Sequence, residues 1–240
     1  MSQFIKRLFH GLLKLVLLLT LFIAIVGVTV CGLVGYTGYH SATADYPVTQ
    51  AVNDVQMKSN YTTLENMPDI YKNAVVAVED HRFYDHGGLD IVATTRALLR
   101  NFFSGDIQEG GSTITQQLAK NLYFTQEQSF RRKLAEVFVA VDLERHFTKD
   151  QILEAYINCI YYGNGYYCVH DASVGYFGVV PLQMNNDQAT LLAGVPNAPS
   201  RYAPTVDMSL ARQRQQHVLS AMVEEGYLTE EEALAIPQGY

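Results

Sequence analysis

Residues 79–88 read Glu79-Asp80-His-Arg-Phe-Tyr-Asp-His-Gly-Gly88 and combine many titratable side chains with two adjacent glycines. The run before them begins with Pro68, a residue favoured in the first turn of a helix, and places apolar residues at helical spacing. We therefore expect a buried helix that ends at Glu79. Burial raises the pKa of a carboxyl group toward working pH, as a general base requires. The stretch fits a charged helix end followed by a polar turn equally well.

The N-terminal part of the chain is apolar. Residues 12–34 contain one charged residue, and as a helix they would extend over roughly 35 Å, against a hydrocarbon core of about 30 Å. We predict a transmembrane anchor within residues 1–40. Lys6 and Arg7 precede the apolar run, so the N-terminus is expected in the cytoplasm and the remainder outside it. A signal peptide cleaved after residue 44 is the alternative, which the length of the run disfavours.

The remaining composition indicates one mainly α domain. We expect a polar spacer over residues 41–60 and a domain over residues 61–240 with its own core. Capping-box patterns begin at Thr113, Thr148 and Thr229, and each opens a run with apolar residues at helical spacing. Convincing alternating strands are absent from the sequence. The formal net charge of −7 argues against a nucleic-acid-binding protein.

The cysteines and histidines do not predict a metal site. Cys159 and Cys168 are nine residues apart in a compartment where disulfides persist, so they fit either a bridge across a loop or two buried thiols. No CxxC or HExxH spacing occurs, which removes the usual zinc signatures.

An apolar patch lies within residues 93–103. Its members are flanked by Arg96 and Arg100, and they are Leu98, Leu99, Phe102 and Phe103. The pattern fits either ordinary core packing or partial insertion into the membrane interface.

A second informative stretch covers residues 110–122. Its apolar residues recur four apart and should face the core, namely Ile114, Leu118 and Leu122. Gln117, Lys120 and Asn121 would then project to the other side. The Gly-Gly pair presents backbone N–H groups at a helix start, where an anion can bind. A capped helix with a polar face is the plainer alternative.

A third stretch begins at Ser129. Arg131, Arg132 and Lys133 cluster in an otherwise acidic domain and favour an anionic ligand such as phosphate. Arg132 and Glu136 form an i,i+4 pair. The apolar residues that follow predict a buried stripe, made of Leu134, Val137, Phe138 and Val141.

Together these motifs resemble the peptidoglycan glycosyltransferases, glycosyltransferase family 51, over roughly residues 60–240. The family pattern Glu-Asp-x-x-Phe-x-x-His-x-Gly matches residues 79–88, Gly-Gly-Ser-Thr-Ile-Thr-Gln-Gln-x-x-Lys-Asn matches residues 110–121, and Arg-Lys-x-x-Glu matches residues 132–136. Ile-Leu-x-x-Tyr-x-Asn follows at residues 152–158. The resemblance implies a lysozyme-like, bilobal helical domain in the bacterial plasma membrane, which serves cell-wall biogenesis and cell shape.

The resemblance also implies roles for individual residues. Glu79 would be the base that takes a proton from a sugar hydroxyl of lipid II as it attacks the lipid-linked glycan chain, with inversion and release of lipid pyrophosphate. The expected substrate-binding residues are Asp80, Phe83, His86, Gly111, Ser112, Gln117, Lys120, Asn121, Arg132 and Lys133, of which the basic ones would stabilise the pyrophosphate. Glu136, as a second catalytic glutamate, would position these cations or help to bind a divalent cation, Mg or Mn.

Two departures from the family pattern stand out. Gln128 occupies a position where family members often carry arginine, and Cys168 stands where glycine is common. The chain contains no Ser-x-x-Lys motif, so we expect a monofunctional enzyme whose partners are lipid II, the membrane and other cell-wall synthesis proteins. A lysozyme-like hydrolase and a non-catalytic binding protein are the competing hypotheses.

Overall fold

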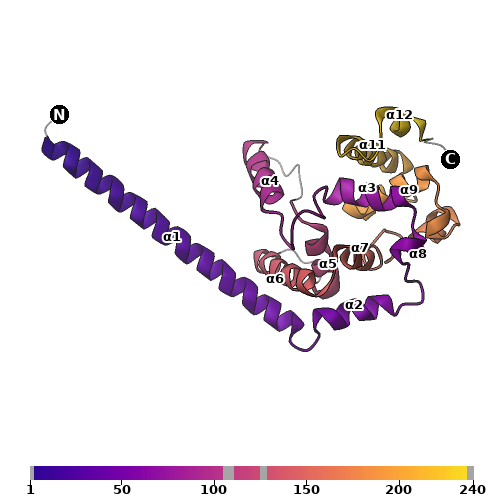
Figure 1. The fold of residues 1–240 in the computed structure, drawn as a ribbon, viewed down its shortest axis with the longest axis horizontal. Coiled ribbons are helices and arrows are strands. Elements are labelled where there is room, and N and C mark those ends of the chain that lie inside the picture. The colour runs from indigo at the N-terminus through magenta and orange to yellow at the C-terminus, as the bar shows by residue number, and fades with distance from the viewer. Residues whose placement is uncertain (1–2, 105–110, 125–128, 237–240) are drawn as a thin grey trace.

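The computed structural model describes the backbone of residues 3–104, 111–124 and 129–236, and within these ranges every regular element is a helix (Figure 1). This confirms the predicted mainly α class. The α-helices are α1 (Gln3–Thr43), α2 (Val48–Gln56), α3 (Asp69–Glu79), α4 (Ile91–Ser104), α5 (Ile114–Tyr123), α6 (Phe130–His146), α7 (Lys149–Ile157), α8 (Val169–Phe177), α9 (Asn186–Gly194), α10 (Pro199–Tyr202), α11 (Met208–Glu224) and α12 (Glu230–Ala235). Short 3₁₀ turns occur at Leu64–Asn66, Pro181–Gln183 and Val195–Asn197.

Helix α1 extends away from the rest of the molecule for most of its length (Figure 1). Its segment Phe9–Thr43 has a mean hydropathy of 2.8 in its most apolar window, and no residue of that window is buried. The helix is long and apolar enough to cross a membrane. It is therefore consistent with a membrane location for this chain.

The last turns of α1 pack closely along α6. A Cβ atom added to Gly35 would lie 2.6 Å from the ring of Phe138, and one added to Gly38 would lie 2.9 Å from Ala135 Cβ. The Tyr39 hydroxyl donates a hydrogen bond to Asp142 Oδ2 at 3.0 Å. The two glycines thus allow the helices to approach to a distance that larger side chains would prevent.

The stripe of α6 predicted to face the core instead lies only half-buried. Leu134 and Phe138 contact α1, and the fully buried side of α6 carries Ala135, Val139 and Leu143. The prediction was wrong because α6 lies between two apolar partners. It packs on α1 through residues that include Ala135 and Phe138, and on α5 and α7 within the domain.

Residues 48–56 differ from the predicted polar spacer. They form α2, whose buried residues repeat at helical spacing and are Val48, Ala51, Val52 and Val55. This side of α2 packs on α6 and α7. The Tyr123 hydroxyl also donates to the carbonyl of Tyr46 at 2.8 Å. The folded domain therefore begins well before residue 61.

The domain consists of two groups of helices that share one core. In one group α3, α9 and α11 pack on each other, and in the other α5 packs on α6 and α7. Large buried side chains join the groups, including Tyr71, whose hydroxyl is 2.7 Å from that of Tyr162. This arrangement agrees with the predicted bilobal helical fold.

Local predictions have mixed outcomes. Capping boxes form at Thr113, Thr148 and Thr229, as predicted. Cys159 and Cys168 are free thiols, so the disulfide alternative is wrong. The predicted apolar patch of α4 and Gln128 lie outside the described side chains, although Ile91 and Val92 at the start of α4 are exposed.

Candidate active site

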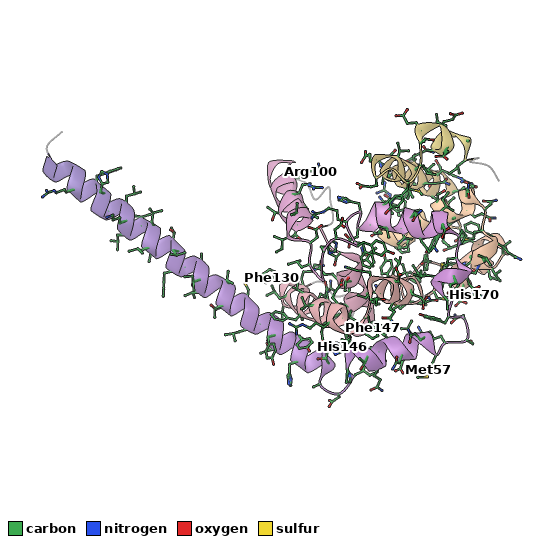
Figure 2. The ribbon with its side chains drawn as sticks, viewed as in Figure 1. Met57, Arg100, Phe130, His146, Phe147 and His170 are labelled. Atoms are coloured by element: carbon green, nitrogen blue, oxygen red, sulfur yellow. The ribbon has the colours of Figure 1, made fainter. Side chains whose placement is uncertain are left out.

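A cavity of about 620 Å³ lies between the two groups of helices. Residues from α3, α5, α6 and α11 line it, together with part of α4 and the loop before α5. Five of the lining side chains are lysine or arginine, namely Arg96, Arg100, Lys120, Lys133 and Arg214. Figure 2 labels Arg100 on α4. Six lining residues are acidic, namely Glu79, Asp80, Asp90, Glu136, Glu224 and Glu225, so the cavity places cations and carboxylates side by side.

Glu79 is the last residue of α3, and its side chain is only 8% exposed. Its Oε2 accepts a hydrogen bond from Gln117 Nε2 at 2.8 Å, and the Tyr156 hydroxyl donates to Gln117 Oε1 at 3.1 Å. The tyrosine thereby fixes the amide so that its NH₂ group faces the carboxylate. Glu79 Oε1 is buried and accepts no hydrogen bond within the described part of the chain. One carboxylate oxygen is therefore held while the other is available.

Burial raises the pKa of Glu79 above its ordinary value. The hydrogen bond from Gln117 opposes this effect, as do the positive charges of Arg214 and Lys120. Asp80 on the same turn raises the pKa further. A partly desolvated carboxylate with a raised pKa is a better proton acceptor than an exposed one, provided that it stays ionised.

Lys120 comes from α5 and lines the same cavity as Glu79. Burial lowers the pKa of its ammonium group, and the nearby charges of Lys133 and Arg132 lower it further. The carboxylates of Glu136 and Glu79 act in the opposite direction. Lys120 is thus a cation held in a partly dry site, where it would interact strongly with a phosphate group.

Glu136 is completely buried and holds two cations of α6. Its Oε1 lies 2.9 Å from Arg132 Nε and its Oε2 lies 3.0 Å from Lys133 Nζ. Lys133 Nζ also donates to Ser112 Oγ at 2.7 Å, which ties α6 to the loop before α5. The predicted Arg132–Glu136 pair is confirmed. Since both carboxylate oxygens are engaged, Glu136 does not fit the role of a ligand to a divalent cation here.

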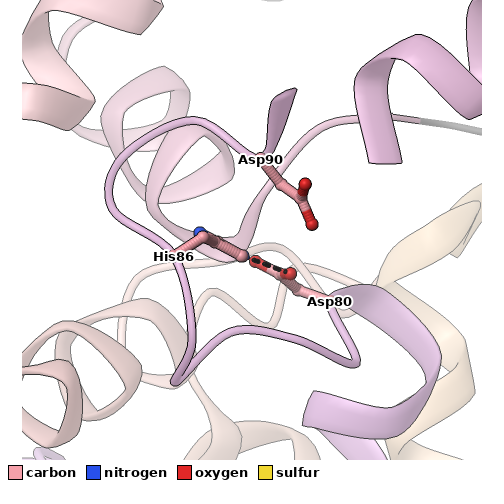
Figure 3. A group of neighbouring side chains, drawn as sticks. All are labelled: Asp80, His86 and Asp90. Carbon is pink, nitrogen blue, oxygen red and sulfur yellow. Dashed lines mark hydrogen bonds and ion pairs between the residues drawn. The ribbon is translucent and has the colours of Figure 1, made fainter. Parts of the chain in front are cut away.

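The loop after α3 is fixed by the pair of His86 and Asp80, shown in Figure 3. His86 Nε2 lies 2.7 Å from Asp80 Oδ1, and Asp80 Oδ2 accepts the backbone N–H of Ile114 at 3.0 Å. These contacts join the loop to the start of α5. Gly88 lies against α6, because a Cβ atom there would meet the backbone of α6 at 2.7 Å.

Asp80, His86 and Asp90 offer donor atoms within 4.8 Å of one another, but the donors are already engaged. Arg82 binds Asp90 through both Nε and Nη2, and the N–H of Ala93 donates to the same carboxylate. A divalent cation would have to displace the arginine. The trio therefore does not fit a metal site in this arrangement.

The structure brings most of the sequence-predicted residues together. The cavity is lined by Glu79, Asp80, Gly111, Ser112, Gln117, Lys120, Lys133 and Glu136. Phe83 is buried in the core beneath the ammonium of Lys149, and Asn121 donates to the carbonyl of Gln117. His86 and Arg132 lie behind the lining, paired with Asp80 and Glu136.

The sequence reading missed Tyr156, Arg96 and Arg214. Tyr156 lies on α7 within the matched Ile-Leu-x-x-Tyr-x-Asn pattern but was given no role, and Arg96 lies beside the apolar patch of α4. Arg214 lies near the buried Ala211 and Val218 of α11, at the spacing of one helical face. An arginine on a core-facing stripe is the one sequence signal that points to it.

Comparison with known proteins identifies the family. The family model described as Transglycosylase matches residues 46–223, a range that includes α2. Penicillin-binding protein 1A of Aquifex aeolicus is 45% identical over 175 residues, covering 73% of this chain and 24% of that protein. Penicillin-binding protein 1F of Bacillus subtilis is 40% identical over 172 residues, covering 72% and 24%.

A crystal structure of penicillin-binding protein 1A from Haemophilus influenzae aligns with a TM-score of 0.42 and 21% identity, covering 74% of this chain and 17% of that one. The chain spans about a quarter of the length of the two curated relatives above. The extent of the family match and the identity to these relatives lead to one conclusion: this chain belongs to the transglycosylase family.

Proposed function

We propose that this chain is a membrane-anchored peptidoglycan glycosyltransferase that polymerises lipid II into β-1,4-linked glycan strands. The observation that carries the proposal is the buried carboxylate of Glu79 on the wall of a cavity that Lys120 and Lys133 also line. A proton acceptor beside cations suits the transfer of a sugar from a pyrophosphate leaving group. Membership of the transglycosylase family supports the same reaction class.

The proposed reaction is one displacement with inversion. A sugar hydroxyl of lipid II forms a bond to the anomeric carbon of the lipid-linked glycan chain while its proton passes to Glu79. The bond from that carbon to the pyrophosphate oxygen breaks, and its electron pair stays on the pyrophosphate. Lys120 and Lys133 would stabilise the charge that develops there, and Glu136 would hold Lys133 and Arg132 in place.

The proposed orientation has the N-terminus in the cytoplasm and the domain outside it. The order of basic residues and apolar run supports this orientation. Partners beyond the lipid substrate, such as other cell-wall synthesis proteins, remain part of the proposal. The proposed steps do not include a metal ion, and the predicted use of a divalent cation, Mg or Mn, stays a prediction.

The test is incubation of purified protein with lipid II, followed by separation of the glycan products by length. The wild type should form long strands, and Glu79→Gln and Lys120→Ala should form none under the same conditions. Glu65→Gln, which alters an exposed glutamate outside the cavity, is the matched control and should retain wild-type activity. Polymerisation by Glu79→Gln would remove the base assignment, and release of soluble fragments from cell-wall sacculi would favour a hydrolase instead.

A further inference from the structure

We propose that Arg214 is a positioning residue that holds the second oxygen of Glu79 and keeps this carboxylate ionised for catalysis. This inference rests on the proposed function above. Arg214 belongs to α11, whereas the glutamine that holds Oε2 belongs to α5. Its Nη2 lies 3.7 Å from Glu79 Oε1, the oxygen that accepts no hydrogen bond within the described residues.

Arg214 is largely buried, and the neighbouring helix leaves room for its side chain. Its side chain is only 16% exposed, and its Nε atom is buried without a hydrogen-bond partner among the described residues. A Cβ atom on Gly194 of α9 would lie 2.9 Å from Arg214 Cγ, so the absence of a side chain there leaves room for the arginine stem. Burying a guanidinium nitrogen that lacks a hydrogen bond is costly unless a nearby carboxylate compensates the charge. Glu79 is the carboxylate that the structure places beside it.

The charged groups that act on Glu79 come from three helices. Asp80 shares its helix end, Lys120 faces it from α5 and Arg214 faces it from α11, while Gln117 and Tyr156 contribute neutral contacts. Lys120 would be committed to the pyrophosphate during the reaction. Arg214 would then be the cation that offsets the burial of Glu79 throughout, because a positive charge near a carboxylate lowers its pKa.

The separation of 3.7 Å between Nη2 and Oε1 also has a functional meaning. It exceeds the distance of a charge-assisted hydrogen bond, about 2.7–2.9 Å. A tighter bond between Arg214 and Glu79 would strongly stabilise the ionised carboxylate, which would make Glu79 a weaker base. A looser ion pair orients the carboxylate electrostatically and leaves Oε1 able to accept the substrate proton.

The experiment compares Arg214→Gln and Arg214→Lys with wild type and with Arg145→Gln, which alters an exposed arginine of α6. Initial rates of lipid II polymerisation are measured as a function of pH and substrate concentration. Removing the positive charge should raise the pKa of the base, so the acidic limb of the Arg214→Gln profile should move up by about one pH unit. At pH values on that limb, kcat should fall about tenfold while KM changes little. Arg214→Lys should recover most of the loss.

The double variant Glu79→Gln/Arg214→Gln separates positioning from other roles. If Arg214 acts through Glu79, its removal should lower no further any residual rate that Glu79→Gln shows at high enzyme concentration and long incubation. An Arg214→Gln enzyme with the wild-type pH profile, or one that raises KM and leaves kcat unchanged, would overturn the proposal. Thermal melting checks the fold, and if Arg214→Gln does not fold, the pH profile of Arg214→Met, which also removes the charge but keeps an unbranched stem, takes its place. A wild type that forms no glycan strands would instead refute the function on which the proposal rests.

Discussion

Replacing Glu136 by glutamine should destabilise the domain more than its conservative shape suggests. The carboxylate is completely buried, and each oxygen is paired with a different cation of the same helix, Arg132 at 2.9 Å and Lys133 at 3.0 Å. Glutamine keeps the shape but replaces one oxygen with an NH₂ donor. Whichever way the amide lies, one cation loses its acceptor and faces a donor.

The exposure of the two cations sets the size of the effect. Removing one partner of a buried ion pair costs about 3–5 kcal/mol when the other charge stays buried. Lys133 is 46% exposed and can turn toward water, whereas Arg132 is 15% exposed and cannot. The amide oxygen also still lies beside one of the two cations. We therefore expect a loss of about 2–3 kcal/mol, which corresponds to a fall in Tm of about 5–10 °C for a domain of this size.

Thermal unfolding of the purified protein in detergent, followed by far-UV circular dichroism, measures this loss. Asp69→Asn is the matched control, because Asp69 also pairs with a lysine on its own helix but is 89% exposed. Its Tm should equal that of the wild type, since exposed ion pairs contribute little. If Glu136→Gln melted together with this control, Glu136 would not be the buried anchor of the two cations.

Three further predictions follow from single positions. Burial lowers the pKa of Lys120, so the rate of polymerisation should decline as the pH rises through that pKa and the ammonium loses its charge. Lys120→Arg, which stays charged, should move the basic limb of the pH–rate profile to higher pH. Basic limbs that coincide for the two enzymes would contradict this. Gly88→Ala should cost about 1–3 kcal/mol in melting experiments because its Cβ would meet the backbone of α6, whereas Gly87→Ala, with open space around it, should not. Arg82 holds the pKa of the Asp90 carboxyl at about 2, below its ordinary value. The stability that the ionised Asp90 contributes is therefore present above about pH 4 and is lost as the pH falls toward 2. Asp90→Asn should lower Tm at neutral pH and flatten that acid loss.

Features that depend on neighbours along the chain could be predicted from the sequence. The capping boxes at Thr113 and Thr148 form because their partners are three residues away. The end of α3 at Glu79 follows from the change from an apolar run to a polar turn. The same locality made the Arg132–Glu136 pair predictable, as these residues lie one turn apart on a helix.

Features that depend on packing between distant segments could not be predicted in this way. The spacing of apolar residues in α6 indicates that a face is buried but not which element covers it, so the side that contacts α1 was mistaken for the core side. In α2 the apolar period is present over a short polar segment, where composition suggested a spacer. Short helices gain most of their stability from tertiary contacts, which composition does not reveal.

The candidate site shows the same division. Glu79, Lys120 and Lys133 stand in compact motifs and were predicted, whereas Arg214 approaches Glu79 from a helix more than a hundred residues further along the chain. Tyr156 likewise reaches the site only through the amide that it orients. The motifs thus supply the reacting groups, and distant helices supply the groups that hold them.

The placement of α6 connects the anchor with the proposed chemistry. On one side of α6, Ala135 and Phe138 meet the glycines of α1, and on another side Lys133 and Glu136 line the cavity. Both contacts lie within two turns of one rigid helix, so the position of α1 in a bilayer would fix the height of the cations above it. The pyrophosphate of a lipid-linked sugar is confined to the membrane surface. A domain on a flexible tether would hold its cations at varying heights above the membrane, whereas the phosphate stays at a constant height. Under the proposed function, the close packing at Gly35 and Gly38 therefore serves catalysis as well as attachment.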